Sequence, residues 1–392
     1  MQNQDNIDHI YTIINIIGQG GFAFIYLVRN ENNHNLYVAK VRRNENQQDF
    51  NRELQMTTIV SGLNNPNLIH LIGHGNGTIS YLGNVENERN YLILDYHQKG
   101  DLLKYVQIPN RGFIELHAKY IFKKILRAVQ AFHGVGICHR NLKLDDILLD
   151  QKFNPIVSDF CLATNNNVNA LNNFAVTRHY MSPQVINHQV YNGFKQDIFS
   201  LGVLLFSLVT NRFGFNDATN HDNLYSLIIH NNYNEYWNFM ENIGINLSPS
   251  LKDLYIRMIA FDENQRPSID QILQDPWLEI NDLNNAQQAQ LEIQIHEEFI
   301  IRENEINQHI NLQIQQNQHN LQNQQNQQNQ QNQQNQQNQQ NQQNQHNLQN
   351  QQNQQNQQNQ QNQQNQQNQQ NQQNQQNQQN QQNQQNQNLN NP

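Results

Sequence analysis

Residues 138–149 read CHRNLKLDDILL, and residues 158–161 read SDFC. These two segments decide the fold of the chain. They set polar and charged side chains, among them Asn141, Asp146 and Asp159, between leucine and isoleucine residues. Upstream of them the chain alternates short β-type runs with turns, and downstream its apolar residues recur at helical spacing. The two segments therefore lie in the second, more helical part of the chain.

Apolar residues follow a strand pattern before Gly100 and a helix pattern after it. Strands are predicted at 10–17, 23–28, 36–41, 68–73 and 91–95, with one helix at 48–60. Helices are predicted at 116–133, 197–210, 223–229, 249–260 and 268–273. A small β-rich lobe thus precedes a larger helical lobe, and the two join near residues 95–100. A cleft between two lobes is a usual place for a small ligand.

A glycine-rich turn and a lysine within a strand precede the two segments. Gly18 and Gly20 lie between two predicted strands, and without a Cβ their backbone can approach a phosphate group closely. By itself this pattern is more typical of an ordinary β-turn. Lys40 stands at the centre of the apolar strand 37–41, and Glu53 on the next predicted helix is a candidate charge partner for it.

Taken in order, the glycine turn, Lys40, Glu53 and the two quoted segments resemble the motif set of the eukaryotic protein kinase family. Further matches are residues 180–184 (YMSPQ), 197–202 (DIFSLG) and 266–267 (RP). Residues 247–249 (LSP) and 275–278 (DPWL) look like the calcium/calmodulin-dependent group of Ser/Thr kinases. The resemblance covers residues 10–278 and implies an α+β, bilobal protein-kinase fold. Its small β-rich N-lobe would span residues 10–95 and its larger α-helical C-lobe residues 100–278.

The resemblance implies that ATP and Mg²⁺ bind in the cleft, and it assigns a role to each matching residue. Adenine would lie between Ile17, Ile25 and Val38 on one side and Leu148 on the other, beside Leu94 and the backbone of Asp95 and His97. Lys40, held by Glu53, would bind phosphates next to Gly18 and Gly20, and Asp159 and Asp146 would bind magnesium. Lys143 and Thr177 match the pair typical of Ser/Thr specificity. Asp101 matches an acidic position that contacts ribose or a basic substrate residue, although an ordinary acid at a helix start fits equally well.

The chain departs from the family at the centre of the catalytic loop. Asn141 stands where the family has its catalytic aspartate, and Asp146 stands where it has a metal-binding asparagine. An amide can orient a substrate hydroxyl but hardly takes its proton. Because general-base catalysis contributes roughly 10²–10⁴-fold, phosphoryl transfer from ATP to protein Ser/Thr is expected to be weak or absent. An active Ser/Thr kinase with an atypical loop, and a pseudokinase scaffold or assembly protein, stay open as alternatives.

Smaller departures point the same way. Ala23 replaces the third glycine of the turn, Cys161 replaces the glycine of a hinge, and Gln184 replaces the glutamate that would pair with Arg266. The segment 159–184 offers few hydroxyl groups, namely Thr164, Thr177, Tyr180 and Ser182. We therefore expect no strong switch by phosphorylation of this segment.

Composition argues against several other classes of protein. The net charge of −9, with a basic cluster only at residues 40–43, gives nucleic-acid binding little support. The longest strongly apolar run, 201–209, is far shorter than the roughly 20 residues of a membrane span. Two cysteines, Cys138 and Cys161, are too few for a disulfide framework, which favours an intracellular, cytoplasmic protein. His70 and His74 lie in a predicted strand and turn, so no metal besides magnesium is expected there.

The ends of the chain differ from its centre. Residues 1–9 are expected to be a short N-terminal extension. In residues 279–314 apolar side chains recur at spacings of three, four and seven, which predicts a helical linker or a short coiled coil. By analogy with the calcium/calmodulin-dependent group, this segment is alternatively a regulatory one that folds back on the C-lobe. Residues 315–392 are uncharged and are Gln or Asn at all but six positions, which predicts disorder and a tendency to self-association.

Overall fold

The computed structural model describes residues 6–21, 23–43, 46–166, 171, 177–279 and 285–388. Phe22 of the glycine turn and the greater part of residues 167–176 lie outside the described residues, as do 280–284 and both chain ends. The chain divides into two units, residues 1–309 and residues 310–392. The first unit contains both lobes and the first part of the last helix, so it contains every residue for which the sequence predicts a site.

The N-lobe is a closed barrel with one helix. Its strands are β1 (Asn6–Ile7), β2 (Tyr11–Gln19), β3 (Ala23–Asn30), β4 (Leu36–Arg42), β5 (Leu71–Tyr81) and β6 (Asn84–Asp95), and its helix is α1 (Gln47–Ser61). All neighbouring strands are antiparallel, in the order β1-β2-β3-β4-β6-β5, and β1 closes the barrel by pairing with β5. Ile7 is fully buried in the barrel core. The expected N-terminal extension therefore belongs to the lobe from Asn6 onward, because β1 completes its hydrogen bonding.

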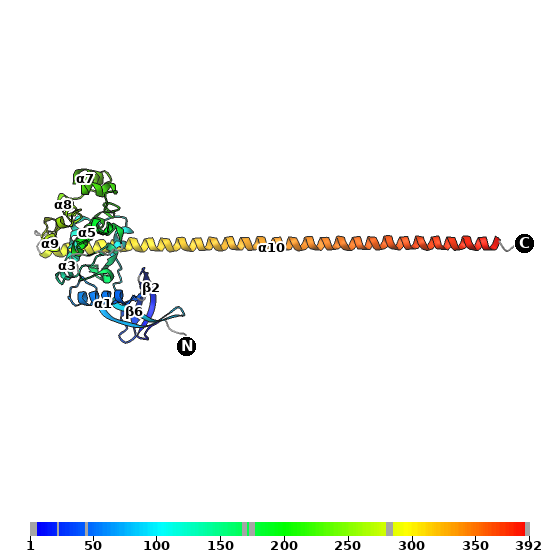
Figure 1. Cartoon of the computed structure of the whole chain (residues 1–392), viewed down its shortest axis with the longest axis horizontal. Helices are drawn as coiled ribbons and strands as arrows, with labels where there is room; N and C mark the ends of the chain where they lie inside the picture. Colours follow the sequence, from blue (N-terminus) through cyan, green and yellow to red (C-terminus); the bar gives the residue numbers. More distant parts are fainter. Residues whose placement is uncertain are drawn as a thin grey trace. The chain divides into compact units, whose positions relative to one another are not determined.

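The C-lobe is mainly helical. Its α-helices are α2 (Leu102–Gln107), α3 (Glu115–Gly134), α4 (Pro183–Ile186), α5 (Gly193–Thr210), α6 (Asn223–Ile229), α7 (Tyr233–Asn242), α8 (Pro249–Met258), α9 (Ile269–Leu273) and the first part of α10 (Asn285–Asn388). Short 3-10 helices are η1 (Leu144–Asp146), η2 (Phe160–Leu162), η3 (Arg178–Tyr180), η4 (Glu263–Gln265) and η5 (Pro276–Leu278), and a hairpin joins β7 (Ile147–Leu149) to β8 (Pro155–Val157). Figure 1 shows the helices of this lobe gathered around α5 and α3. The predicted order of β-rich and helical lobes is confirmed.

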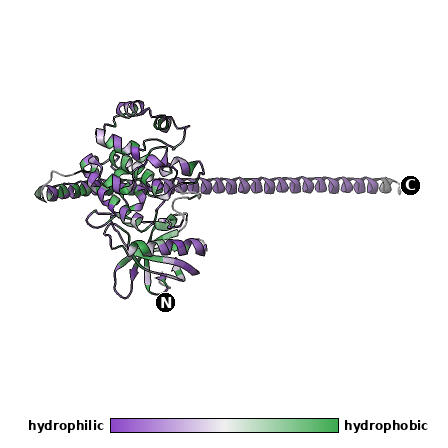
Figure 2. Cartoon of the chain, turned by 60° about the vertical axis from the view of Figure 1, so that its left-hand side comes forward, coloured by the Kyte–Doolittle hydropathy of each residue, from purple (hydrophilic) through white to green (hydrophobic). Residues whose placement is uncertain are grey.

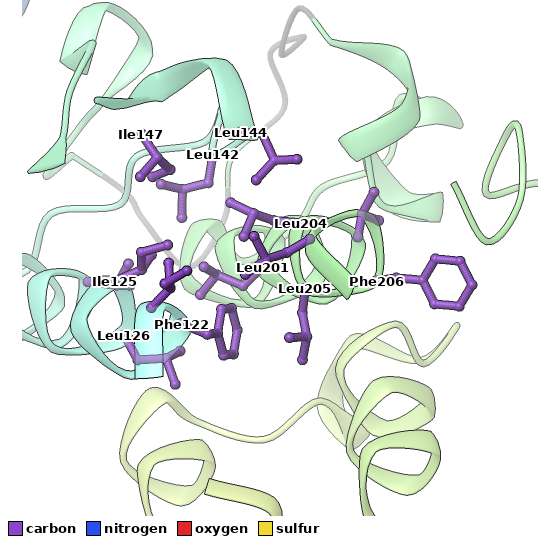
Figure 3. Packing of buried hydrophobic residues seen from close by; sticks show 14 of the residues in the cluster. Phe122, Ile125, Leu126, Leu142, Leu144, Ile147, Leu201, Leu204, Leu205 and Phe206 are labelled. Carbon is purple, nitrogen blue, oxygen red and sulfur yellow. The ribbon is translucent and has the colours of Figure 1, made fainter. Parts of the chain in front are cut away.

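Helices α3 and α5 form the floor under the catalytic loop. In the close view of Figure 3, Leu142 and Leu144 of the loop point toward Leu201 and Leu204 of α5, beside Ile125 of α3. All five side chains are at most 1% exposed. Among the described helices, α5 is also the one long and apolar enough to cross a membrane, but 78% of it is buried inside the lobe. Its apolar surface therefore anchors the loop on which Asn141 lies.

The first part of α10 packs on the C-lobe. Leu291, Ile295, Phe299 and Ile306 recur along one face of the helix, and all of them are buried in the C-lobe core. The ring of Phe299 stacks on Phe153 at 4.9 Å and meets Tyr105 and Phe113 at 5.4 and 5.1 Å. The helix predicted for residues 279–314 is therefore present from Asn285 onward. Its apolar face is covered by the lobe of the same chain, and so it is not an isolated linker.

Arg302 fixes the same part of α10 by polar contacts. Its side chain is fully buried, and its guanidinium group donates hydrogen bonds to the backbone carbonyls of Tyr105, Arg111 and Gly112 at 2.7–2.9 Å. It also pairs with Glu298 at 2.6 Å and lies 3.8 Å from the centre of the Phe113 ring. Three carbonyls, one carboxylate and one ring thus satisfy a buried arginine, which is the condition for placing such a charge in a core.

The second unit is residues 310–392, for which composition predicts disorder from residue 315 onward. It continues α10 as a helix through Asn388, and every described side chain from 310 to 383 is exposed. Figure 2 shows its uniformly hydrophilic colouring. An α-helix pairs its backbone groups internally and Gln is a fair helix former, so a helix needs no buried face to close its hydrogen bonds. The disorder predicted for residues 315–392 stays a prediction.

Candidate functional site

A cavity of about 290 Å³ lies between the β-sheet of the N-lobe and the catalytic loop of the C-lobe. Its lining includes most of the residues that the sequence singles out. From the N-lobe come Gly20, Ala23, Ile25, Val38, Lys40, Glu53, Leu94 and Asp95, and from the C-lobe Asp145, Asp146, Leu148, Asp159 and Cys161. One wall is apolar and the other carries carboxylates and a lysine. Such a cavity suits a ligand with a flat apolar part and a charged part.

The hairpin of β2 and β3 forms the roof. Gly18 pairs with Ile25, and the backbone N–H of Gly20 donates to the carbonyl of Ala23 at 3.0 Å. A Cβ on Gly18 would meet the Ile25 side chain at 3.4 Å, which is close to an ordinary van der Waals contact. Ala23 is buried as the first residue of β3, which tolerates alanine at this departure from the family pattern. The turn thus keeps the backbone close to the cavity.

The structure brings together only some of the residues expected around adenine. Ile25 and Val38 line the roof and Leu148 lines the opposite side, as the resemblance implies. Ile17 is 45% exposed and does not line the cavity, and neither do Gly18 and His97. The backbone N–H of Asp95 donates to the carbonyl of His70 at 3.2 Å, so a base would meet Asp95 at its carbonyl oxygen. The assignment of Ile17, Gly18 and His97 to nucleotide contact stays a prediction.

Lys40 is the centre of a charge cluster that lines the cavity. Its Nζ lies 2.6 Å from Oε1 of Glu53 on α1 and 2.6 Å from Oδ1 of Asp159. Burial opposes its charge, yet Asp159 and Glu53 together raise the pKa of Lys40 well above its usual range. Burial also disfavours the charged form of Asp159, but the Lys40 ammonium outweighs this and lowers the Asp159 pKa. Lys40 and Asp159 are therefore charged at neutral pH, and the predicted pair of Lys40 with Glu53 is present.

Asp159 is held in place by the residues after it. It adopts a left-handed backbone conformation with φ 61°, and Phe160 is buried with its ring 4.8 Å from His139 and 5.5 Å from Phe132. The thiol of Cys161 hydrogen-bonds to the Asp159 carboxylate. The Cys161 carbonyl accepts a hydrogen bond from Arg52 of α1 at 3.3 Å. The Cys161 side chain thus contacts Asp159, and the backbone carbonyl of the same residue ties the segment to α1.

The catalytic loop places Asn141 against Asp146. Asn141 Nδ2 donates to Oδ2 of Asp146 at 3.3 Å, and Thr177 Oγ1 donates to Oδ1 of Asn141 at 3.0 Å. Burial and the nearby charge of Asp159 raise the pKa of Asp146 well above its usual range, while Lys143, with Nζ 4.0 Å from Oδ1 of Asp146, opposes the shift. The four residues Asn141, Lys143, Asp146 and Thr177 thus form one contact network.

His139 is a structural residue of the loop. Burial lowers the pKa of its imidazole, and its Nε2 lies 2.9 Å from the carbonyl of Ser158. The backbone N–H groups of His139 and Arg140 both donate to the carboxylate of Asp197 on α5, at 2.8 and 2.6 Å. The sequence includes Asp197 in a matching motif but gives it no role in the site. Its backbone contacts anchor the strained Arg140, which has φ 73°.

Gln184 stands where the family has a glutamate, and its side-chain amide fits between the neighbouring residues. Nη2 of buried Arg266 donates to Oε1 of Gln184 at 2.7 Å, and Nε2 of Gln184 donates to the carbonyl of Phe261 at 2.7 Å. Burial lowers the pKa of Arg266 to about 10 despite its acidic neighbours. The expectation that Arg266 lacks an anionic partner at position 184 is confirmed. An amide, however, satisfies both neighbours, since a glutamate could not donate to Phe261.

Asp146 and Asp159 are the residues that could hold a metal ion in the cavity. Within the described residues there is no preformed group of three or more histidine, cysteine, aspartate or glutamate side chains with metal-site geometry. Both carboxylates nevertheless line the same cavity, and carboxylate oxygens are the ligands that magnesium prefers. Magnesium commonly takes one or two carboxylates and completes its shell with water and phosphate oxygens. The donor set therefore fits a magnesium ion that arrives with a phosphorylated ligand.

The family model of the protein kinase domain matches residues 11–278. The chain belongs to the protein kinase family. Over 279 residues the chain is 28% identical to a carbon catabolite-derepressing protein kinase of Secale cereale, covering 69% of the chain and 51% of that relative. It is 30% identical over 213 residues to a mitosis inducer protein kinase of Schizosaccharomyces pombe, covering 54% of the chain and 34% of the relative. A probable serine/threonine-protein kinase of Saccharomyces cerevisiae is 32% identical over 190 residues, 48% of the chain and 12% of the relative.

The chain thus spans about half or less of the length of these relatives. The matched domain ends at Leu278, whereas the first structural unit continues to His309. Residues 285–309 of α10 are therefore an addition to the kinase domain that packs into its C-lobe core. The predicted family is confirmed, and protein kinases as a family use ATP and Mg²⁺.

Arg42 is a residue beside the site to which the sequence motifs assign no role. The pattern that points to it is its position two residues after Lys40 on the same strand, because alternate residues of a strand lie on the same face.

Proposed function

We propose that this protein is an ATP-binding, Ser/Thr protein-kinase-like protein whose phosphoryl transfer is weak or absent. The observation that carries the proposal is the combination of an assembled Lys40–Glu53–Asp159 cluster with an asparagine at position 141. The cluster supports nucleotide binding, because a charged lysine faces the cavity with its partners in place. Asn141 argues against efficient proton transfer, because a side-chain amide is not a base at neutral pH.

Each residue that lines the cavity has a separate role in this proposal. Ile25, Val38 and Leu148 bind the base, and Lys40 binds phosphate oxygens once they replace Asp159 as its partner. Asp159 and Asp146 hold magnesium, which neutralises phosphate charge when bound. Asn141 orients a substrate hydroxyl through Oδ1 of its side-chain amide. Without a substrate, this oxygen accepts a hydrogen bond from Oγ1 of Thr177. The missing general base is expected to cost roughly 10²–10⁴-fold in rate.

The chain also supports two narrower proposals. Its segments 247–249 and 275–278 favour the calcium/calmodulin-dependent group of Ser/Thr kinases. The uncharged Gln/Asn repeat beyond residue 315 favours an assembly role by self-association, which would make the protein a scaffold in the absence of catalysis. Both cysteines are unpaired and buried, which is consistent with an intracellular setting.

The alternative is an active kinase with an atypical loop. It is favoured by the carboxylate of Asp146, which is hydrogen-bonded to Asn141 and so lies beside the expected position of the substrate hydroxyl. In this alternative the protein transfers phosphate at the rate usual for protein kinases, about 1–100 s⁻¹.

Transfer of labelled γ-phosphate from ATP to a basic protein substrate separates these functions. We expect the wild-type chain to transfer at least 10²-fold more slowly than a typical protein kinase, and the Lys40→Met variant to lose even that residual rate. A wild-type turnover of about 1 s⁻¹ or more, abolished in Lys40→Met, would contradict impairment and establish the atypical active kinase. A slow rate that persists in Lys40→Met would point to a contaminating kinase.

A further inference from the structure

Glu53 of α1 is paired with two cations. Its Oε1 lies 2.6 Å from Nζ of Lys40, and its Oε2 lies 3.3 Å from Nη1 of Arg42. The side chains of Glu53 and Arg42 are buried, with 2% and 5% exposed. Among the described residues Oε2 accepts no hydrogen bond, so the ion pair with Arg42 is the contact that compensates its burial.

The β-strand geometry explains why Arg42 reaches this position. Alternate residues of a strand point to the same face, so Lys40 and Arg42 of β4 share the face on which Glu53 lies. The next arginine, Arg43, follows the opposite alternation; it is exposed and donates to the carbonyl of Gly20 at 3.1 Å. Arg42 is absent from the cavity lining, whereas Lys40 and Glu53 are part of it. Arg42 thus supports Glu53 from the side away from the ligand.

The charges of Lys40, Arg42, Glu53 and Asp159 are balanced as long as Arg42 is present. Lys40 and Arg42 carry two positive charges, and Glu53 and Asp159 carry two negative charges. A bound nucleotide would make Lys40 share its charge between the phosphates and Glu53, so that Lys40 alone compensates the Glu53 carboxylate less fully. Without Arg42, Glu53 would then be a buried carboxylate with a shared or distant cation, which is costly and favours rotation of α1 away from β4.

We propose that Arg42 is a positioning residue that holds Glu53, and through it α1, against β4 while Lys40 binds phosphate. This inference rests on the proposed nucleotide-binding function. It predicts that nucleotide affinity depends on Arg42 even though Arg42 does not touch the ligand, and that this dependence passes through Glu53.

The test measures Mg²⁺–ADP affinity by calorimetry on the full chain and on five variants, which are Arg42→Met, Arg42→Lys, Glu53→Gln, Glu53→Gln/Arg42→Met and Arg29→Met. We expect Arg42→Met to weaken binding by about tenfold, the change that corresponds to one lost interaction of moderate strength. Arg42→Lys should restore most of the affinity, because it returns the charge. In a Glu53→Gln background, Arg42→Met should have no further effect. Arg29→Met is the control, since Arg29 lies on β3 in an exposed pair with Glu31 and should leave affinity unchanged.

Amide hydrogen exchange of α1 in the protein without nucleotide gives a second readout. Faster exchange of residues 50–60 in Arg42→Met than in Arg29→Met is expected. If the wild-type chain binds no Mg²⁺–ADP, the proposed function fails, while the exchange of α1 still decides the role of Arg42. Wild-type affinity and exchange in Arg42→Met would overturn the inference, as would an undiminished effect of Arg42→Met in the Glu53→Gln background. Should Arg42→Met fail to fold, Arg42→Gln replaces it, since glutamine keeps a polar end without the charge.

Discussion

The side-chain amide of Asn141 donates a hydrogen bond to the carboxylate of Asp146, with 3.3 Å between Nδ2 and Oδ2. The two residues exchange the amide and the carboxylate that the protein kinase family has at these positions. Because the two side chains are in contact, a substitution at either position changes the electrostatic surroundings of the other. An aspartate at position 141 would face the carboxylate of Asp146, and two carboxylates in contact cannot both ionise at ordinary pH. Restoring aspartate at position 141 alone therefore places two carboxylates in repulsive contact.

The first prediction follows from this contact. Asn141→Asp should raise phosphoryl transfer over the wild type, because it supplies a general base. The double variant Asn141→Asp/Asp146→Asn should raise it further, toward the full 10²–10⁴-fold expected of a base, because its carboxylate is free of a like-charged neighbour. Initial rates of labelled phosphate transfer at saturating ATP provide the measurement. Equal rates in the wild type and both variants would show that Asn141 does not limit the reaction.

The second prediction concerns the docking of α10. Phe299 is fully buried among Phe153, Tyr105 and Phe113, so Phe299→Ala should lower the free energy of unfolding by about 3–5 kcal/mol. Ile301→Ala is the matched control two residues away, because Ile301 is 54% exposed and should cost far less. Urea unfolding of both variants measures the difference. Equal stability of the two variants would mean that this face of α10 does not pack on the C-lobe in solution.

Truncation tests the same packing at the level of the segment. A chain that ends at His309 should unfold cooperatively at nearly the wild-type temperature, because it retains the first structural unit. A chain that ends at Leu278, where the family match ends, should unfold at a clearly lower temperature and bind a hydrophobic dye, since it uncovers Tyr105, Phe113 and Phe153. Indistinguishable unfolding of the two chains would contradict the assignment of residues 285–309 to the C-lobe core.

The contact of Glu298 on α10 with His117 and Arg302 predicts that the stability of the fold depends on pH. Burial disfavours the charged form of Glu298, but hydrogen bonds from His117 and Arg302 outweigh this and lower its pKa. A carboxylate whose pKa is lowered by folding stabilises the fold above its unfolded pKa of about 4.3, and this contribution is lost as the pH falls through the folded value. The stability difference between wild type and Glu298→Gln should therefore be largest near neutral pH and shrink below about pH 4. Glu297→Gln, at an exposed neighbour, should show a small difference at every pH.

The parts of the fold that could be predicted are those with a local signal. Strand and helix periods gave the two lobes, and the order of short motifs gave the cavity with Lys40, Glu53, Asp146 and Asp159. The fit of Gln184 to Arg266 and Phe261 could not be predicted, because the second contact involves a backbone carbonyl distant in sequence. Arg42 was missed because a charged residue after an apolar strand ordinarily faces solvent.

Helix α10 shows a second feature that could be predicted only in part from the sequence. Spacing indicated that residues 279–314 carry an apolar face, but spacing cannot identify the surface that covers it. That surface is formed by residues such as Phe153, which adopts a left-handed backbone conformation with φ 60°. A bulky residue in this conformation costs energy, and the contact with Phe299 is one interaction that offsets it. Such a compensation arises only once the tertiary structure is formed.

The central claim is that the cavity around Lys40 binds nucleotide together with magnesium, and thermal unfolding tests it most directly. At a ligand concentration a hundred times Kd, binding should stabilise the folded chain by about 2.7 kcal/mol and raise the unfolding temperature by several degrees. We predict this rise for the wild type with ATP and Mg²⁺, a smaller rise with ATP alone, and none for Lys40→Met. An unfolding temperature of the wild type that does not change with millimolar ATP and Mg²⁺ would contradict the claim.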